Sequence, residues 1–342
     1  MKKCKGCGEI LQYEQKDMLG YAPSEDFDYC QRCFRLTHYG DTSKVSKKFT
    51  SNDDIIESYK NINDALFVLI VDAFDALFLD QDYLLDTFKD KKLLLIINKI
   101  DLLPKNINDN KISDLYLDVL KKCNNINCLL TYKNDTTFND LFFEILEESG
   151  MSKVVFAGRA NVGKSSLINK LIENQELTTS IYPGTTLKVN EITYKDYLFI
   201  DTAGLIDDES FLSHLYNKNI KKLLPLKTIK RQIFQLYENQ SYVINGLLKI
   251  DVIPKGNASI EFMVENNLII HRTKLENSER YFKNNCIKDP LRLLPLKANE
   301  FYLDGIKLFY LKGLGLIKVK GSGKVVVNVN DKIKIYTSEV NL

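Results

Sequence analysis

The segment from Gly158 to Ser165 carries the glycines, the lysine and the hydroxyl group that a phosphate-binding loop (P-loop) requires. An apolar stretch at residues 154–156 precedes it and a helical pattern at 166–172 follows it, which is the strand–loop–helix context of this motif. Backbone N–H groups of such a loop surround phosphate oxygens, and the helix N-terminus adds partial positive charge. Lys164 is predicted to neutralise the β- and γ-phosphates, and Ser165 to bind Mg²⁺. The nucleotide contacts predicted in this loop are Gly158, Asn161, Val162, Gly163, Lys164, Ser165 and Ser166.

Two further motifs have the residue types that respond to a γ-phosphate. Asp201-Thr-Ala-Gly204 follows an apolar stretch, so Asp201 can hold Mg²⁺ through water and the Gly204 N–H can contact the γ-phosphate. The Pro-Gly-Thr-Thr sequence at 183–186 lies between this motif and the P-loop, as expected of a first switch segment. Thr186, with Thr185 as the alternative, would complete the metal shell. We therefore predict that Lys164, Thr186 and Gly204 act in catalysis. These three residues, together with Asp201 and Thr185, are predicted to contact the nucleotide or its metal.

Asn98-Lys99-Ile100-Asp101 follows an apolar stretch and has the pattern of a guanine-reading motif. The Asp101 carboxylate can accept hydrogen bonds from both N1–H and the N2 amino group of guanine. Adenine offers no such pair of donors, so the motif selects GTP over ATP. Lys99 is expected to lie over the base and Asn98 to brace the P-loop.

The segment Thr131-Tyr132-Lys133 occupies the place of the second base-contacting loop. Its match to the usual Ser-Ala-Lys sequence is poor. A backbone contact to guanine from Thr131 and Lys133 and an ordinary turn at the end of a strand both remain open.

Two positions depart from the pattern of efficient GTPases. Leu205 follows Gly204, where Ras-like proteins have the glutamine that orients water, so intrinsic hydrolysis is predicted to be slow. Asn161 in the P-loop is typical of GTPases that bind K⁺ beside the phosphates. Alternatively, Asn161 has a structural role and only caps the loop.

Four cysteines near the N-terminus have the spacing of a metal site. Cys4 and Cys7 form one C-x₂-C pair and Cys30 and Cys33 form another, with 22 residues between the pairs. Four thiolates from two tight turns suit a structural, tetrahedral Zn²⁺. A redox dithiol would not need two such pairs, and disulfides are disfavoured if the protein is cytoplasmic, as the absence of a signal peptide predicts. Basic and aromatic residues follow the second pair, a composition typical of RNA-contacting surfaces.

The elements that must position these motifs differ between the two parts of the chain. Strand and helix patterns alternate up to about residue 204, which predicts a mainly parallel sheet with helices on both faces. Strands are predicted at 66–71, 93–97, 127–130, 154–156, 190–194 and 197–200, and a helix at 113–122. Beyond residue 217, short antiparallel strands are predicted at 242–248, 259–264, 268–271, 305–310, 316–320 and 324–329. The predicted domains are a Cys4 zinc finger (1–48), a nucleotide-binding α/β domain (49–216) and a β-rich α+β domain (217–342).

Charge is distributed unevenly along the 342 residues, which contain 47 lysines and arginines and 45 acidic residues. Residues 216–342 hold 22 Lys and Arg against 11 Asp and Glu, a net charge of +11, and residues 1–215 hold the other 25 and 34, a net charge of −9. A basic C-terminal part favours a polyanionic partner, most commonly nucleic acid. A solvated lysine-rich surface is the alternative. The longest apolar stretches are too short to cross a bilayer, so no membrane partner is expected.

The motifs occur in the order guanine motif, base loop, P-loop, first switch and second switch, whereas small GTPases begin with the P-loop. A four-cysteine finger, a circularly permuted GTPase domain and a basic β-rich domain together resemble the YqeH family of ribosome-assembly GTPases. The segments that carry the resemblance are 30–38, 158–166, 183–186 and 313–319. The resemblance implies GTP hydrolysis in small ribosomal subunit biogenesis, with rRNA or the small subunit as partner and no role for DNA.

Two other functions are alternatives. One is a GTP-dependent regulator of tRNA or translation that never binds a subunit precursor. The other is a zinc-thiol or nitric-oxide-related redox enzyme, which the intact GTPase motifs and the lack of a haem or flavin signature disfavour.

Overall fold

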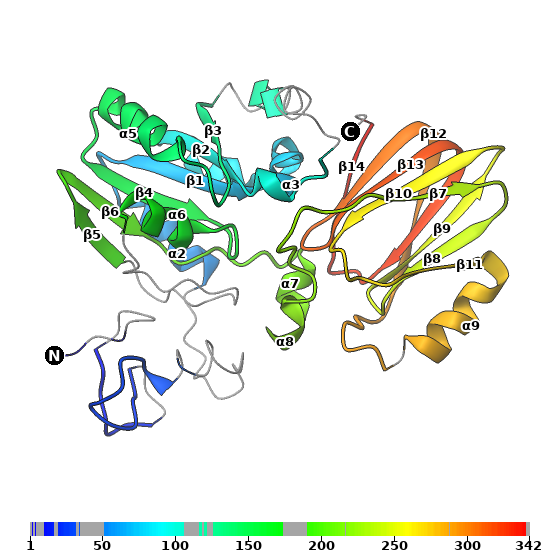
Figure 1. Ribbon diagram of the computed structural model, residues 1–342, viewed down its shortest axis with the longest axis horizontal. Coiled ribbons are helices and arrows are strands. Elements are labelled where there is room, and N and C mark those ends of the chain that lie inside the picture. The colour runs from blue at the N-terminus through cyan, green and yellow to red at the C-terminus, as the bar shows by residue number, and fades with distance from the viewer. Residues whose placement is uncertain are drawn as a thin grey trace. The chain divides into compact units, whose positions relative to one another are not determined.

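The computed structural model describes residues 2, 4, 10–16, 20–31, 34, 51–105, 116–117, 120–121, 126–173, 190–215, 217–286 and 288–339 (Figure 1). The chain forms two compact units, one of residues 1–100 and 116–207 and the other of residues 101–115 and 208–342. Each unit has its own sheet and its own hydrophobic core. The predicted borders at 48/49 and 216/217 stay predictions.

A six-stranded sheet in the order β3-β2-β1-β4-β6-β5 is the centre of the N-terminal unit. All neighbouring strands are parallel except β5 and β6, which confirms the predicted mainly parallel sheet. The strands are β1 (Leu66–Asp72), β2 (Lys92–Asn98), β3 (Cys128–Leu130), β4 (Lys153–Gly158), β5 (Asn190–Tyr194) and β6 (Tyr197–Asp201). In β1 and β4 nearly every residue is buried, because both faces of a parallel sheet are covered.

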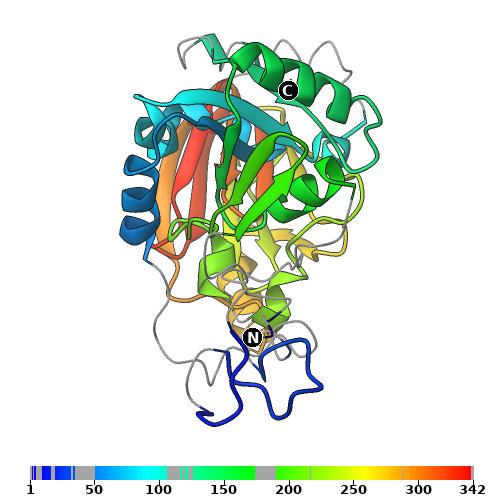
Figure 2. The same ribbon diagram turned by 90° about the vertical axis from the view of Figure 1, so that its left-hand side faces the viewer.

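Helices cover both faces of this sheet (Figure 2). Phe138, Phe142 and Leu146 of α5 (Phe138–Ser149) share one core with Leu167 and Ile168 of α6 (Lys164–Leu171). On the other face, Tyr59 of α2 (Asn52–Lys60) packs with Phe67 and Phe88. The remaining short elements are α3 (Ala73–Ala76) and the 3₁₀-helices η1 (Leu79–Gln81), η2 (Tyr83–Phe88) and η3 (Ile100–Leu102). Most of the helix predicted at 113–122 lies outside the described residues.

The C-terminal unit is an antiparallel eight-stranded sheet in the order β11-β8-β9-β13-β10-β7, with β12 on β13 and β14 on β12. Its strands are β7 (Gln232–Leu236), β8 (Gln240–Ile244), β9 (Leu248–Pro254), β10 (Ala258–Val264), β11 (Ile270–Lys274), β12 (Lys297–Leu311), β13 (Gly315–Val329) and β14 (Ile335–Ser338). The helices are α7 (Phe211–His214), α8 (Asn217–Ile220) and α9 (Leu275–Asn285), the last of which packs beside β8 and β11. The antiparallel β-rich character is as predicted. Within the described residues of the whole chain, no helix is long and apolar enough to cross a membrane.

Several predicted strands of this unit have different bounds. The stretch 242–248 is not one strand, because the chain turns at Asn245-Gly246, where Asn245 has φ 45°, and β9 begins only at Leu248. Conversely, 316–320 and 324–329 belong to one strand, β13. Gly321 and Gly323 lie inside it with φ 142° and 134°, and a Cβ at Gly323 would collide with the carbonyl oxygen of Ile253 in the adjacent strand. Here glycine permits a close approach of strands and is not a turn signal.

The aromatic core over β4 and β6 gives the first prediction. Phe142 is fully buried and contacts Phe138, Phe156 and Phe199. Phe142→Ala is expected to lower the free energy of unfolding of the N-terminal unit by ~3–5 kcal/mol, since it leaves a cavity. Chemical denaturation monitored by circular dichroism measures the change. Leu141→Ala on the same helix removes a side chain that is 46% exposed and is the control, expected to cost less than ~1 kcal/mol.

Candidate functional site: the P-loop and its surroundings

The P-loop joins the carboxyl end of β4 to the start of α6. Gly163 caps α6 with φ 99°, and an added Cβ there would lie 2.5 Å from the Asn98 side-chain amide nitrogen. At Gly158, φ is 145° and a Cβ would collide with the carbonyl oxygen of Ile70. Asn161 also has a left-handed backbone, with φ 68°. These conformations let the loop curl with its backbone facing inward.

Lys164 lies in the centre of the loop. Its buried ammonium group donates to the carbonyl oxygens of Gly158 and Arg159, each at 3.1 Å. Burial lowers the pKa of Lys164 to about 8, and the nearby charge of Asp201 opposes this shift. Within the part of the chain that the structure describes, this buried cation bonds to carbonyl oxygens, and it is well placed to neutralise a bound phosphate.

Ser165 and Asp201 form the candidate magnesium site. Ser165 Oγ donates to Asp201 Oδ2 at 3.1 Å. Burial raises the pKa of Asp201 to about 6, against the effects of Lys164 and Ser165. Asp201 Oδ1 is buried, and no described residue forms a hydrogen bond with it. A carboxylate oxygen without a partner beside a serine hydroxyl fits a hard divalent cation, whose charge would keep the carboxylate ionised.

The side chains of Asn98 and Lys99 link the end of β2 to the P-loop. Asn98 Nδ2 donates to the carbonyl oxygen of Val162 at 2.9 Å. Lys99, with φ 66°, reaches the Asn161 carbonyl oxygen at 2.6 Å and Asp72 Oδ2 at 3.0 Å.

Asp101 lies in η3, and its side chain is exposed. Its backbone carbonyl oxygen accepts a hydrogen bond from Thr228 Oγ1 at 2.8 Å, and that of Leu102 accepts one from the Ile229 N–H at 2.9 Å. The backbone of the aspartate that is predicted to read guanine is therefore tied to residues 228–229 within the C-terminal unit, while its carboxylate stays accessible.

The loop at 131–133 uses its polar side chains for its own structure. Thr131 is fully buried and donates to Asp135 Oδ2 at 3.2 Å. Burial would raise the pKa of Asp135, but hydrogen bonds from Thr137 and Thr131 outweigh it and hold this pKa below its ordinary value. Lys133 is exposed. The Thr131 backbone is bonded as well, its N–H to the Ile97 carbonyl oxygen at 2.9 Å and its carbonyl oxygen to the Ile100 N–H at 3.4 Å. Of the two predicted contacts, the exposed Lys133 is therefore the better placed to reach a base.

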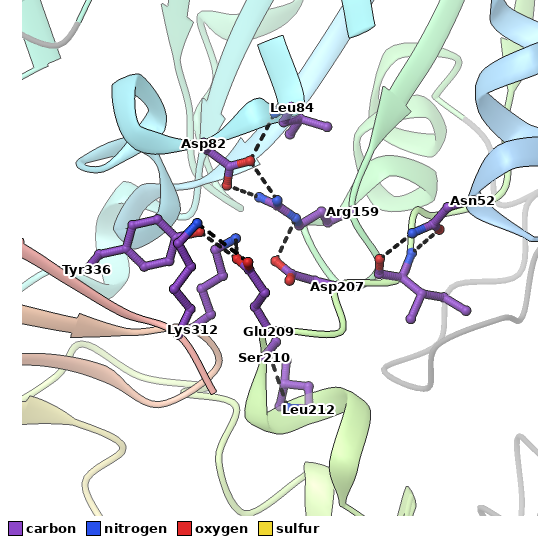
Figure 3. Close-up of polar contacts among 12 residues, drawn as sticks. Asn52, Asp82, Leu84, Arg159, Asp207, Glu209, Ser210, Leu212, Lys312 and Tyr336 are labelled. Atoms are coloured by element: carbon purple, nitrogen blue, oxygen red, sulfur yellow. Dashed lines mark hydrogen bonds and ion pairs between the residues drawn. The ribbon is translucent and has the colours of Figure 1, made fainter. Parts of the chain in front are cut away.

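Arg159, a variable position of the P-loop, is the centre of a buried ion cluster that the sequence analysis did not find (Figure 3). It bonds Asp82 in two places, Nη1 to Oδ2 at 2.8 Å and Nη2 to Oδ1 at 2.9 Å, and its Nε lies 2.7 Å from Asp207 Oδ2. The three side chains are 7%, 5% and 9% exposed. Although burial opposes it, the carboxylates raise the pKa of Arg159 above its ordinary value. No local motif marks these residues, because they come from three distant segments.

Part of the predicted site lies outside the described residues, namely Thr185, Thr186, Cys7 and Cys33. Cys4 and Cys30 are described, both are 2% exposed, and the Cys30 N–H donates to Cys4 Sγ at 3.1 Å. Among the described residues, no group of three or more metal-ligating side chains comes together.

The nucleotide-binding sheet and this loop define the class of the protein. A parallel sheet with a glycine-containing loop that curls around a buried lysine, and an aspartate at the end of the next strand, is the architecture of a P-loop GTPase. Residues 153–251 match the family model described as 50S ribosome-binding GTPase.

Sequence comparison identifies the family within this class. The chain is 32% identical over 298 residues to the uncharacterized protein YqeH of Bacillus subtilis, a match that covers 83% of this chain and 81% of that protein. It therefore belongs to the YqeH family and hydrolyses GTP.

More distant relatives share shorter segments. The NO-associated protein 1 of Arabidopsis thaliana is 28% identical over 307 residues, or 73% of this chain and 54% of that protein. A GTPase Der of Buchnera aphidicola is 29% identical over 213 residues, or 55% of this chain and 44% of that protein. The chain thus spans about half the length of these two relatives.

Exchange of the Asp101 carboxylate tests the predicted guanine site. Asp101→Asn is expected to weaken GTP binding about 100-fold, since a charged acceptor of two hydrogen bonds is lost. The amide can donate to the C2 carbonyl of xanthine, so binding of xanthosine triphosphate should strengthen. Fluorescence titration with both nucleotides measures the change. Asp140→Asn, an exposed aspartate on α5, is the matched control, and equal GTP affinity of the two variants would contradict the assignment.

Proposed function

We propose that this GTPase is a nucleotide-timed switch in assembly of the small ribosomal subunit, and that its C-terminal unit binds rRNA. The observation that carries the RNA part is a basic segment, residues 210–237, which contains six lysines and arginines and no acidic residue. It follows the second switch motif and includes β7. The circularly permuted order of the motifs thus leads the chain from the γ-phosphate sensor directly into the most basic part of the protein.

Side chains of this basic segment are available to a partner. Lys222, Lys227 and Lys230 are exposed, and no acidic side chain of the described residues forms an ion pair with them. Tyr237 and Leu226 are 75% and 82% exposed, so an aromatic ring and an apolar side chain accompany the charges. Lysines for the phosphates and a ring for base stacking are the components of a single-stranded RNA contact.

The middle of the basic segment has a fixed backbone. Asn266 donates to the Thr228 carbonyl oxygen at 3.1 Å and accepts from the Lys230 N–H at 2.8 Å. A fixed backbone lowers the entropic cost of presenting the lysines to a polyanion.

A ribosomal partner also agrees with the comparisons. The family model is described as a 50S ribosome-binding GTPase, and the YqeH relative covers most of the chain. Our choice of the small subunit follows from the sequence resemblance to ribosome-assembly members of the YqeH family.

Three metal sites belong to the proposal. Ser165, Asp201 and Thr186 would hold Mg²⁺ at the phosphates. Cys4, Cys7, Cys30 and Cys33 would hold a structural Zn²⁺. The N–H donation from Cys30 to Cys4 Sγ supports this set, because two cysteines 26 positions apart share one buried corner. K⁺ is proposed at Asn161, whose side-chain oxygen and nitrogen are both buried and form no hydrogen bond with any described residue.

Intrinsic hydrolysis is proposed to be slow. Leu205 is 5% exposed and its side chain has no group that can orient water. We assign transition-state stabilisation to Lys164, Thr186 and the Gly204 N–H.

Sedimentation with ribosomal subunits tests the partner. Neutralising Lys222, Lys227 and Lys230 together to Gln is expected to weaken binding to the small subunit at least tenfold and to reduce the slope of log K against log salt by about 2–3. The measurement compares GDP, GTP and a non-hydrolysable analogue. A triple Gln variant of Lys255, Lys288 and Lys332, exposed lysines outside the basic segment, is the control. Failure of the unmodified protein to co-migrate in every nucleotide state contradicts the assembly role, and equal losses in both variants contradict the assigned surface.

The cation site gives a separate prediction. GTP turnover is expected to be about tenfold faster in K⁺ than in Na⁺ of equal ionic strength, because a bound cation adds charge stabilisation at the phosphates. Asn161→Ala should remove the difference and retain the slower rate. Phosphate release under multiple turnover measures it, and equal rates of the unmodified protein in the two salts would exclude a K⁺ role.

A further inference from the structure

The Lys99 side chain crosses the carboxyl ends of neighbouring strands in the N-terminal sheet. Lys99 directly follows β2, and the P-loop follows β4. Strand β1 lies between these two strands. The last residue of β1, Asp72, is aligned with Asn98, the last residue of β2. A lysine that extends from β2 to the P-loop therefore passes the end of β1, where Asp72 lies.

Two oxygen atoms hold the Lys99 ammonium group. Its Nζ donates to Asp72 Oδ2 at 3.0 Å and to the Asn161 carbonyl oxygen at 2.6 Å. The side chains of Lys99 and Asp72 are 26% and 23% exposed, so their ion pair is screened less than one at the open surface. Asp72 supplies a full negative charge to the ammonium group, whereas the Asn161 carbonyl supplies only a dipole.

The backbone end of Lys99 is held as well. Its N–H donates to Asn98 Oδ1 at 2.8 Å, and the Asn98 amide in turn donates to the Val162 carbonyl oxygen at 2.9 Å. The hydrocarbon stem between the backbone and the ammonium group is flexible when it is free. Because both of its ends are held by groups of the protein, the stem is ordered, and this lowers the entropic cost of any contact that it makes with a ligand.

The second carboxylate oxygen of Asp72 has a different task. Asp72 Oδ1 accepts a hydrogen bond from the Phe74 N–H at 3.0 Å and thereby caps α3. Serine is an N-cap residue of about the same quality as aspartate, but it is shorter and carries no charge. A serine at position 72 therefore retains the cap and loses the ion pair with Lys99, so one substitution separates the two tasks.

We propose that Asp72 is a positioning residue for nucleotide binding, which acts by fixing the stem of Lys99 where a guanine base contacts it. The inference rests on the predicted place of Lys99 over the base and on the GTPase class of the protein. It does not depend on an RNA or ribosomal partner, so a negative result in ribosome sedimentation leaves it unaffected. The base is common to GTP and GDP. Asp72 therefore contributes to the affinity for both nucleotides and not to the rate at which bound GTP is hydrolysed.

Nucleotide affinities of Asp72→Ser test the inference. The dissociation constants for GDP and for a non-hydrolysable GTP analogue are expected to rise together by about fivefold, since the freed lysine stem must be ordered on binding. The single-turnover rate of GTP hydrolysis should stay unchanged. Competitive titration against a fluorescent GDP measures the constants, and phosphate release measures the rate. Asp86→Ser is the matched control, because it breaks an exposed pair of 2.7 Å between Asp86 and Lys89, and it should change neither quantity.

A double-mutant cycle with Lys99→Met shows whether Asp72 acts through Lys99. Methionine retains an apolar stem without the ammonium group, so Asp72→Ser should cause no further loss of affinity in this background. An equal loss in both backgrounds overturns the proposal, as does unchanged affinity of Asp72→Ser or slower hydrolysis of bound GTP. Unchanged affinity of Lys99→Met removes the premise of a base contact and also overturns it. Asp72→Asn retains the shape of the side chain without its charge and should raise the same two constants, so the test does not depend on the folding of Asp72→Ser.

Discussion

The buried guanidinium of Arg159 is the interaction on which the rest of the site depends. A buried cation costs several kcal/mol to desolvate, and only well-aligned partners offset that cost. Asp82, between η1 and η2, and Asp207, after the second switch motif, supply such partners. The cluster adds little net stability, but removing any one member leaves uncompensated charge in the interior. It therefore defines where these two segments meet the P-loop.

Directly after Asp207, the chain passes from the nucleotide-binding unit into the C-terminal unit. Asp207 belongs to the N-terminal unit, and Glu209 is already held within the C-terminal unit by Lys312, Lys334 and the Tyr336 hydroxyl. Although partial burial opposes it, these partners lower the pKa of Glu209, so this residue stays ionised at neutral pH. Asp207 and Glu209, two residues apart, are therefore each held by ion pairs within their own unit.

Local sequence patterns predicted the parts of the site that local physics determines. The strand–loop–helix context placed Gly158 and Lys164 at the end of β4, and the apolar stretches placed Asn98 and Asp201 at strand ends, because a buried strand and its following loop are encoded within some ten residues. The contacts of Asn52 with Ile206 and of Arg159 with Asp82 could not be predicted in this way. The partners lie 154 and 77 positions apart in the chain, and a local sequence pattern does not determine which distant segment packs against it. The Asn245-Gly246 sequence is a turn signal that the strand prediction for 242–248 overlooked. The glycines inside β13 were interpreted as a turn, because a close approach of two strands and a reversal of the chain both require glycine.

Leu205 shows how the structure changes the meaning of a sequence observation. In the sequence, Leu205 stands where Ras-like proteins have the glutamine that orients water, which predicts slow hydrolysis. In the structure its side chain is buried and its backbone pairs with both neighbours of Arg159, so the position is used to anchor the second switch. The position of a water-orienting glutamine is therefore filled by a buried apolar side chain, and its backbone joins the second switch motif to the P-loop.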